Sequence, residues 1–445
     1  MMVKNNKEDN SEKSFKNDAL KYHSRSSMDS LVQSNSKAGK IEVSTTRSLS
    51  SQRDLALAYS PGVAFACMEI KNNSKKVYDY TNKANLVGVV TDGTAVLGLG
   101  DIGVLAAKPV MEGKCALFKK FAGIDAIDIS FDTSNIDKFT DAVSLIGGNF
   151  GGINLEDIKS PNCFIIEKKL QDVMDIPVFH DDQHGTAIVT AAGIVNSCLL
   201  TGRVLSEIRI VINGAGAAGI ACADLLVCLG VKRDNLILCD RSGVIYQDRS
   251  VSMNIWKKQY ATFDKCRTLD EALEGADAVI GLSVKGAITS GMIKKMNKDP
   301  IIFAMANPDP EIDPAAASAA RPDAIIATGR SDYQNQINNV MCFPYVFRGA
   351  LDVRATEINN DMKKAAVHAI AKIARDNENL PQEVIDIYGE RKVFSKDYII
   401  PVPFDRRLYT EVSSSVARAA IASGVSPFTN FDLALYKQDL EKSFQ

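Results

Sequence analysis

The stretch Ile208-Arg209-Ile210-Val211-Ile212-Asn213-Gly214-Ala215-Gly216-Ala217-Ala218-Gly219 decides the fold. Its β-branched start predicts a buried strand, and the apolar residues 217–229 predict a helix that stops at Gly230. The G-x-G-x-x-G loop between them permits a tight turn, a close approach of the backbone to a pyrophosphate, and packing of the helix on the strand. This context predicts dinucleotide binding. The expected binding residues are Gly214, Ala215, Gly216, Ala217, Ala218 and Gly219.

Strands and helices alternate after this unit. Residues 236–239, 278–282 and 301–304 read as further strands, and residues 269–274 read as a short helix. Such alternation with short connections predicts a parallel, doubly wound α/β sheet of the Rossmann type. The last hundred residues are expected to be mainly helical, for example over 362–375.

Asp240 closes the strand at 236–239, 21 residues after Gly219. A carboxylate at this place accepts hydrogen bonds from the adenosine ribose, which favours NAD. The next residue, Arg241, could instead clamp a 2′-phosphate, which favours NADP. We expect both residues to contact the cofactor, and they leave the choice between NAD and NADP open.

A second match to the glycine pattern, Gly98-Leu99-Gly100-Asp101-Ile102-Gly103, lies upstream. Lys108-Pro109 follows it, and proline disfavours a helix there. Asp101 would also repel a phosphate. We therefore expect these glycines to form close-packed turns beside a substrate site and not a second dinucleotide site.

Composition bounds the class of protein. The chain has 445 residues, 52 of them basic and 54 acidic, for a net charge of −2. This balance argues against nucleic acid or a membrane surface as partner, and the sequence has no apolar run of the length that a membrane span needs. Nine scattered cysteines without a Cys-x-x-Cys pair indicate reduced, buried thiols. We expect a cytoplasmic protein, with an organelle matrix as the alternative.

The chain divides into three parts. Residues 1–50 are rich in Ser, Asn and Lys and lack a long apolar run, so we expect a mostly flexible extension. A buried helix over 186–200, closed by Gly202, indicates the boundary between two α/β domains. We assign residues 51–190 to an N-terminal substrate- and metal-binding domain. Residues 191–445 are assigned to the dinucleotide-binding domain with C-terminal helices.

Adjacent carboxylates follow apolar stretches at Glu156-Asp157 and at Asp181-Asp182. Such groups are costly at strand ends unless something neutralises them, and Mg²⁺ or Mn²⁺ prefers oxygen ligands. A solvated acidic turn is the alternative. His180 and His184 lie four residues apart and could bind zinc if they were on a helix. The acidic pair between them and Gly185 after them indicate a loop instead, so a zinc site is disfavoured.

Four further polar residues lie near predicted turns, loops or strand ends. Lys114 is either a surface cation or, in a desolvated cleft beside a metal, a base whose pKa falls. Tyr59 precedes a Pro-Gly turn that could hold its hydroxyl, or it is a half-buried core residue. Asn307 ends an apolar strand and Asn339 lies in an amide-rich loop. Amides like these bind a substrate carboxylate or cap turns.

Together these motifs resemble the malic enzymes, specifically the short bacterial-type form. The similarity extends over about residues 50–375. It is carried by residues 53–64, 108–114, 151–158, 178–187, 214–219, 303–312 and 327–354. Longer malic enzymes have a substrate-binding arginine where this chain has Thr94-Ala95, so the residue that neutralises the substrate carboxylate stays open.

The resemblance implies oxidative decarboxylation of L-malate to pyruvate and CO₂ with reduction of NAD(P)⁺. The short form and Arg241 favour NADP as the cofactor. The resemblance also implies that the protein forms a homodimer. The implied Mg²⁺ or Mn²⁺ ligands are Glu156, Asp157 and Asp182. Lys114, coupled to Asp181, is the implied base for the C2 hydroxyl, and Tyr59 is the implied acid at C3. Asn307 and Asn339 are the implied substrate contacts.

Two alternatives remain beside this reading. One is a hydroxy-acid dehydrogenase that does not decarboxylate, and the other is an inactive dinucleotide-binding module.

Overall fold

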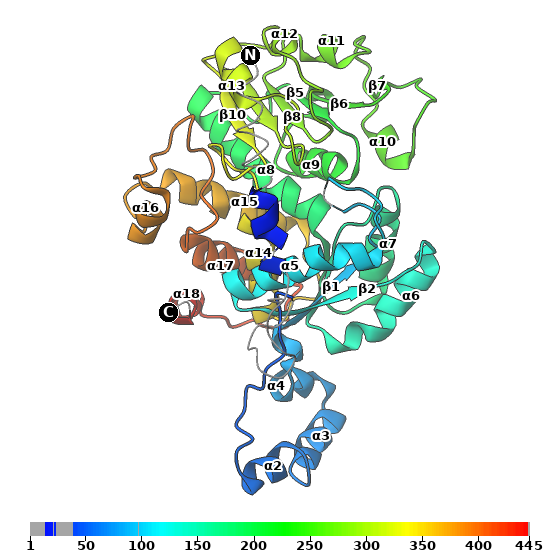
Figure 1. Ribbon diagram of the computed structural model, residues 1–445, viewed down its shortest axis with the longest axis vertical. Helices are drawn as coiled ribbons and strands as arrows, with labels where there is room; N and C mark the ends of the chain where they lie inside the picture. Colours follow the sequence, from blue (N-terminus) through cyan, green and yellow to red (C-terminus); the bar gives the residue numbers. More distant parts are fainter. Residues whose placement is uncertain (1–13, 21, 24–38, 97, 444–445) are drawn as a thin grey trace.

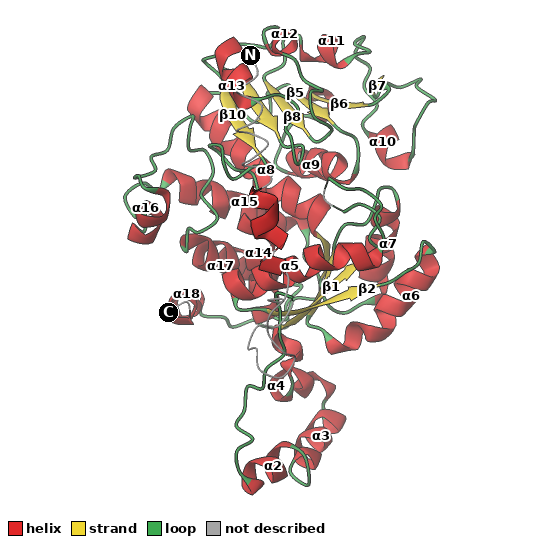
Figure 2. Ribbon diagram, viewed as in Figure 1, coloured by secondary structure: helices red, strands yellow, loops and turns green. Residues whose placement is uncertain are grey.

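The computed structural model describes residues 14–20, 22–23, 39–96 and 98–443. Most of the N-terminal stretch expected to be flexible, residues 1–13, 21 and 24–38, lies outside the described residues. Figure 2 shows two separate sheets with helices around and between them.

The first sheet has four parallel strands in the order β2-β1-β3-β4. Its strands are β1 Leu86–Thr91, β2 Asp125–Ser130, β3 Gly152–Leu155 and β4 Val178–His180. Helices α5 Val104–Ala122, α6 Ile136–Ile146 and α7 Asn162–Val173 belong to this part of the chain, with the 3₁₀ turns η2 Asn82–Asn85 and η3 Gly147–Asn149. Every residue of β1 and β3 is buried, which matches the apolar runs of strands covered on both faces.

The second sheet has six strands in the order β10-β9-β8-β5-β6-β7, parallel except for the edge strand β7. Its strands are β5 Ile210–Asn213, β6 Leu236–Asp240, β7 Gly243–Val244, β8 Ala278–Gly281, β9 Ile301–Ala304 and β10 Ile325–Thr328. The associated helices are α9 Ala217–Cys228, α10 Ile255–Gln259, α11 Leu269–Leu273, α12 Ser290–Ile293 and α13 Pro314–Ala320, with η4 Arg233–Asn235. This is the doubly wound sheet that the alternating pattern predicts.

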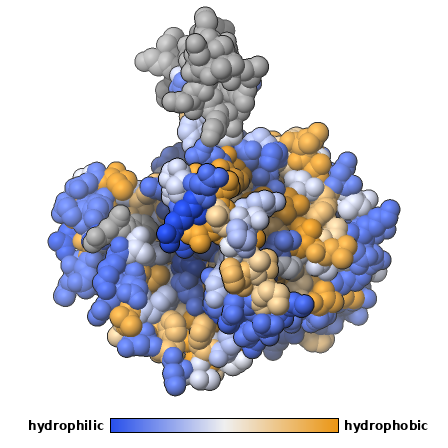
Figure 3. Space-filling view, turned by 90° about the horizontal axis from the view of Figure 1, so that it is seen from below, coloured by the Kyte–Doolittle hydropathy of each residue, from blue (hydrophilic) through white to orange (hydrophobic). Residues whose placement is uncertain are grey.

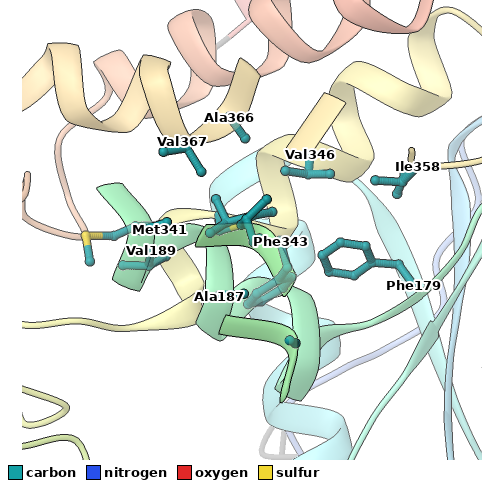
Figure 4. Close-up of a cluster of buried hydrophobic side chains, with 14 of the residues drawn as sticks. Phe179, Ala187, Val189, Met341, Phe343, Val346, Ile358, Ala366 and Val367 are labelled. Atoms are coloured by element: carbon teal, nitrogen blue, oxygen red, sulfur yellow. The ribbon is translucent and has the colours of Figure 1, made fainter. Parts of the chain in front are cut away.

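The long helix α8 Asp181–Thr201 joins the two parts and ends at Gly202, which is left-handed. It is long and apolar enough to cross a membrane by length and composition, but 67% of its most apolar window is buried inside the protein. Figure 4 shows why: Ala187 and Val189 of α8 lie in a cluster with Phe343, Val346 and Val367 from helices near the C-terminal end. We read α8 as the central core helix.

The remaining helices are η5 Asn339–Met341, α14 Phe343–Asp352, α15 Asn360–Arg375, α16 Gln382–Tyr388, α17 Arg407–Ala422 and α18 Leu433–Ser443. Helix α14 packs on α5 of the first part, and α15 packs on α8 (Figure 1). The C-terminal helices thus lie against both parts of the chain. The domain limits near residues 50 and 190 stay a prediction.

The N-terminal elements form an arm. Helices α2 Gln52–Ala58 and α3 Val63–Asn72 make a helical hairpin that projects away from both sheets, joined to the body through η1 Ser74–Lys76 and α4 Val77–Tyr80 (Figure 1). Neither α2 nor α3 has a buried residue. The hairpin is therefore held by its own turn and caps and not by the core of this chain.

The prediction that Pro109 prevents a helix after the second glycine pattern is wrong. Helix α5 runs from Val104 through Pro109 to Ala122. The proline lies on the exposed side, while Met111, Cys115 and Phe118 on the other side are buried. Burial of this apolar face outweighs the lost backbone hydrogen bond, since tertiary packing contributes most of the stability of a helix in a protein.

Candidate functional site

The acidic residues meet because their strands are parallel neighbours. Leu155 at the end of β3 pairs with His180 at the end of β4, so Glu156 and Asp181 both follow at the carboxyl edge of the sheet. Ligands of open α/β sheets bind at this edge. Two separate motifs, 25 residues apart, thereby become one site.

Glu156, Asp157 and Asp182 form the acidic cluster. One oxygen atom from each lies within 4.8 Å of the others. Asp157 has a positive φ of 54°, and its backbone N–H donates to Oδ2 of Asp182 at 2.8 Å. Three carboxylates at this spacing match the oxygen donors that Mg²⁺ or Mn²⁺ prefers, so the residues fit a divalent cation.

Burial reinforces this conclusion at Glu156. Its side chain is almost fully buried, and burial raises its pKa well above the ordinary value, although the nearby Lys114 opposes the shift. The buried Asn154 amide donates to Oε2 of Glu156 at 2.8 Å, so it orients the carboxylate. A second positive charge would stabilise the ionised form of Glu156.

Lys114 projects from α5 into the same site. Its Nζ lies 2.6 Å from Oδ2 of Asp181 and 2.8 Å from Oε1 of Glu156. The ammonium also lies 4.1 Å from the centre of the Phe343 ring, a cation–π contact. Lys114 is thus a buried, fixed cation, and the surface alternative is wrong.

Among the protein groups alone, the pKa of Lys114 is raised. The expected fall depends on a cation beside the lysine, whose charge would oppose Asp181 and Glu156, so it stays a prediction. Burial disfavours the ammonium, but the negative charges of Asp181 and Glu156 outweigh burial. The sequence could not show this, because both carboxylates approach from other elements of the fold.

The expected loop at residues 181–185 is also wrong, because α8 already begins at Asp181. Gly185 is helical, and its lack of a side chain makes room for the Asp181 carboxylate. Asn339 donates from Nδ2 to Oδ2 of Asp181 at 3.0 Å and accepts from Thr186. The first turn of α8 therefore presents Asp181 and Asp182 rigidly to the site.

The two histidines have separate environments. His184 Nε2 lies 2.9 Å from Oε1 of the buried Glu167. Nδ1 of the same His184 ring lies 3.1 Å from Nζ of Lys363. His180 is fully buried, with Nδ1 3.8 Å from Asp182. In the described part of the chain, the grouped ligand atoms with metal-site spacing come from carboxylates and include neither histidine.

Asn307 and Tyr59 are not held in the acidic site. Asn307 is exposed after β9, beside the glycine-rich turn, where a Cβ on Gly98 would lie 3.0 Å from its carbonyl oxygen. Tyr59 lies between α2 and α3 on the projecting hairpin and is 73% exposed. The core alternative for Tyr59 is wrong in this chain.

The glycine loop has the shape that its pattern predicts. A Cβ on Gly219 would lie 1.7 Å from the Gly214 carbonyl oxygen, so the helix and loop could not pack with any side chain there. Gly214 has a φ of 130°, and open space faces Gly216. The backbone before α9 can thus be approached closely, which fits a dinucleotide pyrophosphate.

Four residues that hold the side chains of the candidate sites could not be found from the sequence pattern. Asn154 and Phe343 hold Glu156 and Lys114, and Arg249 and Lys257 bind Asp240. Each acts through a contact between different elements of the fold, and none lies in a motif of its own.

Fold and site together define a two-sheet α/β protein with a dinucleotide loop and a carboxylate–lysine centre. Residues 38–171 match the family model for the malic enzyme N-terminal domain, and residues 183–387 match that for the malic enzyme NAD binding domain. The chain belongs to the malic enzyme family.

Individual proteins of this family are similar to the chain over most of its length. A probable NADP-dependent malic enzyme of Rickettsia prowazekii is 59% identical over 95% of this chain and 54% of its own length. An NADP-dependent malic enzyme of Halomonas elongata is 54% identical over 87% of this chain and 92% of its own. The crystal structure of malic enzyme from Pyrococcus horikoshii superposes with a TM-score of 0.86, at 40% identity over 97% of this chain and 96% of that one. The chain spans about half the length of the first of these curated relatives.

Proposed function

We propose that this protein converts L-malate to pyruvate and CO₂ while reducing NADP⁺, with a divalent cation. The observation that carries the proposal is the position of Lys114 Nζ, 2.6 Å from Asp181 and 2.8 Å from Glu156, next to the acidic cluster of Glu156, Asp157 and Asp182. A proton acceptor and a cation site thus adjoin each other at the carboxyl edge of a parallel sheet. We also infer a cytoplasmic location.

Each residue of the centre has a part in the reaction. When bound by Glu156, Asp157 and Asp182, Mg²⁺ or Mn²⁺ would act as a Lewis acid toward substrate oxygens. Lys114 must be uncharged to take the proton of the C2 hydroxyl as hydride passes from C2 to the nicotinamide, and the charge of a bound cation would lower its pKa toward that state. Asp181 holds the lysine in place and stabilises its charged form after the transfer. The bond between C3 and the departing carboxylate then breaks, CO₂ leaves, and the electron pair of that bond remains in the enolate of pyruvate.

The last step is protonation of C3, for which the resemblance points to Tyr59. Lys114 belongs to α5 in the body of the protein, whereas the hairpin of α2 and α3 that carries Tyr59 projects away from the body (Figure 1). Reaching the site of its own chain would require the hairpin to swing back across the molecule. We therefore assign the acid at each site to a second copy of the chain.

The surface of the hairpin supports a homodimer. Leu55, Leu57, Phe65 and Met68 are all exposed, with Phe65 at 74%. Figure 3, which views the molecule from the side toward which the hairpin projects, shows apolar residues in orange among polar ones in blue. Clustered apolar side chains on an arm indicate an interface, and a second copy that receives the arm would bury them while gaining Tyr59.

The proposed function is tested with L-malate, Mg²⁺ and NADP⁺. One pyruvate and one CO₂ should appear for each NADPH formed. Oxaloacetate accumulating without pyruvate would identify a dehydrogenase that does not decarboxylate. Absence of NADPH formation from NADP⁺, and of NADH formation when NAD⁺ replaces it, would identify a non-catalytic dinucleotide-binding module.

A further inference from the structure

Asp240 occupies the place where a Rossmann-type unit meets the adenosine ribose. Cys239 of β6 pairs with Asn213 of β5, and its carbonyl accepts a hydrogen bond from the Gly214 N–H at 2.9 Å. Asp240 is therefore beside the dinucleotide loop. A free carboxylate here would accept hydrogen bonds from the ribose hydroxyls and select NAD.

The Asp240 carboxylate is already occupied in this chain. Arg249 Nη2 donates to both of its oxygens at 2.5 and 2.7 Å, Lys257 Nζ donates at 2.6 Å, and the Ser242 backbone N–H donates at 2.9 Å. A carboxylate has about four acceptor positions, so these four contacts fill them. Burial opposes the ionised form, but Lys257 and Arg249 outweigh it and lower the pKa of Asp240.

Arg249 is a fixed support, because its side chain is only 3% exposed. Besides Asp240, its guanidinium donates to the backbone carbonyls of Val251, Gly243 and Val244. Lys257 is less constrained. It donates to Asp240 and to the Ser252 carbonyl, which leaves one of its three N–H groups for a ligand.

The local charge favours an anion. Asp240 contributes one negative charge, while Arg249 and Lys257 contribute two positive charges. Arg241, next along the chain, is exposed, and its guanidinium makes no hydrogen bond or ion pair within the described residues. A 2′-phosphate carries a charge of about −1.5 to −2 at neutral pH, which this excess of positive charge can balance.

We propose that Lys257 and Arg241 bind the 2′-phosphate of NADP⁺, and that Asp240 and Arg249 are positioning residues that hold Lys257. Asp240 thereby loses its usual role as a ribose acceptor. The inference rests on the proposed function only for the identity of the cofactor, since it concerns recognition of the adenosine end of the molecule.

Binding of two fragments tests the proposal without turnover. The full protein is titrated calorimetrically with 2′,5′-ADP and with 5′-AMP, which differ by the 2′-phosphate. The unmodified protein should bind 2′,5′-ADP at least about tenfold more tightly, the effect of one charged hydrogen bond. Lys257→Gln and Arg241→Gln should each lower the affinity for 2′,5′-ADP by about tenfold. The affinity for 5′-AMP should change by less than about twofold.

Lys258→Gln is the matched control, because Lys258 is the exposed neighbour of Lys257 on α10. It should leave both affinities within about twofold, whereas a general effect of net charge would weaken 2′,5′-ADP in all three variants. Equal binding of the two fragments by the unmodified protein, or unchanged 2′,5′-ADP binding in Lys257→Gln and Arg241→Gln, overturns the inference. Selective 2′,5′-ADP binding without malate turnover overturns the proposed function and leaves this inference in place.

Discussion

A Cβ atom placed on Gly185 would lie 1.9 Å from Oδ1 of Asp181, one helical turn earlier in α8. The same Asp181 binds Lys114 through its other carboxylate oxygen. The missing side chain at residue 185 thus allows the carboxylate to take the position in which it holds the proposed base.

We predict that Gly185→Ala displaces the Asp181 carboxylate and lowers kcat by about 100-fold, the usual cost of a displacement near 1 Å. Overpacking should also lower the free energy of unfolding by about 1–3 kcal/mol. Steady-state kinetics and urea unfolding measure the two effects. Gly113→Ala, in α5 beside Lys114, is the control, since its Cβ meets nothing within 4 Å and should leave kcat unchanged. Wild-type kcat in Gly185→Ala contradicts the assigned geometry.

Lys114→Met should lower kcat by about 10²–10⁴-fold, as expected for loss of a general base, with a smaller change in KM. Lys108→Met is the matched control on α5, because that lysine is half exposed and pairs with Asp128 outside the acidic cluster. It should retain activity. If Lys114→Met folds, binds 2′,5′-ADP and still turns over L-malate at the wild-type rate, Lys114 is not the base.

Asp182→Asn should weaken Mn²⁺ binding by at least about tenfold, because the cation loses a charged oxygen ligand. The paramagnetic resonance of free Mn²⁺ measures the affinity without any substrate. Asp172→Asn, at an exposed residue of α7, should not change it. Chelation by EDTA should abolish pyruvate formation, and added Mg²⁺ should restore it. Equal Mn²⁺ affinity in the two variants would exclude Asp182 as a ligand.

Tyr59→Phe and Lys114→Met should each be inactive alone, yet regain activity when refolded together. A mixed dimer then has one site with an intact Lys114 and an intact Tyr59 from the partner. Random pairing makes half of the dimers mixed, each with one of two sites working, so about one quarter of wild-type activity should return. If Tyr59 served its own chain, neither site of the mixed dimer would work and no activity would return.

Much of the second sheet could be predicted from the sequence, because its determinants are local. A β-branched run, a glycine loop and an apolar helix follow one another over residues 208–229, and each depends on its own residues. The prediction failed at Pro109 and at residues 181–185. At both places a local helix-disfavouring residue was overruled by burial of apolar side chains, of Met111 and its neighbours in α5 and of Ile188 and its neighbours in α8.

The sequence by itself determined which carboxylates follow strand ends, where the dinucleotide loop lies and to which family the chain is similar. Only the tertiary structure decided what those groups experience. Parallel pairing brings Glu156 and Asp181 to one edge, where Lys114 lies between them and its pKa is raised. Arg249 and Lys257 likewise occupy the Asp240 carboxylate with ion pairs. Charge, burial and hydrogen bonding depend on partners distant in sequence, and folding alone brings those partners together.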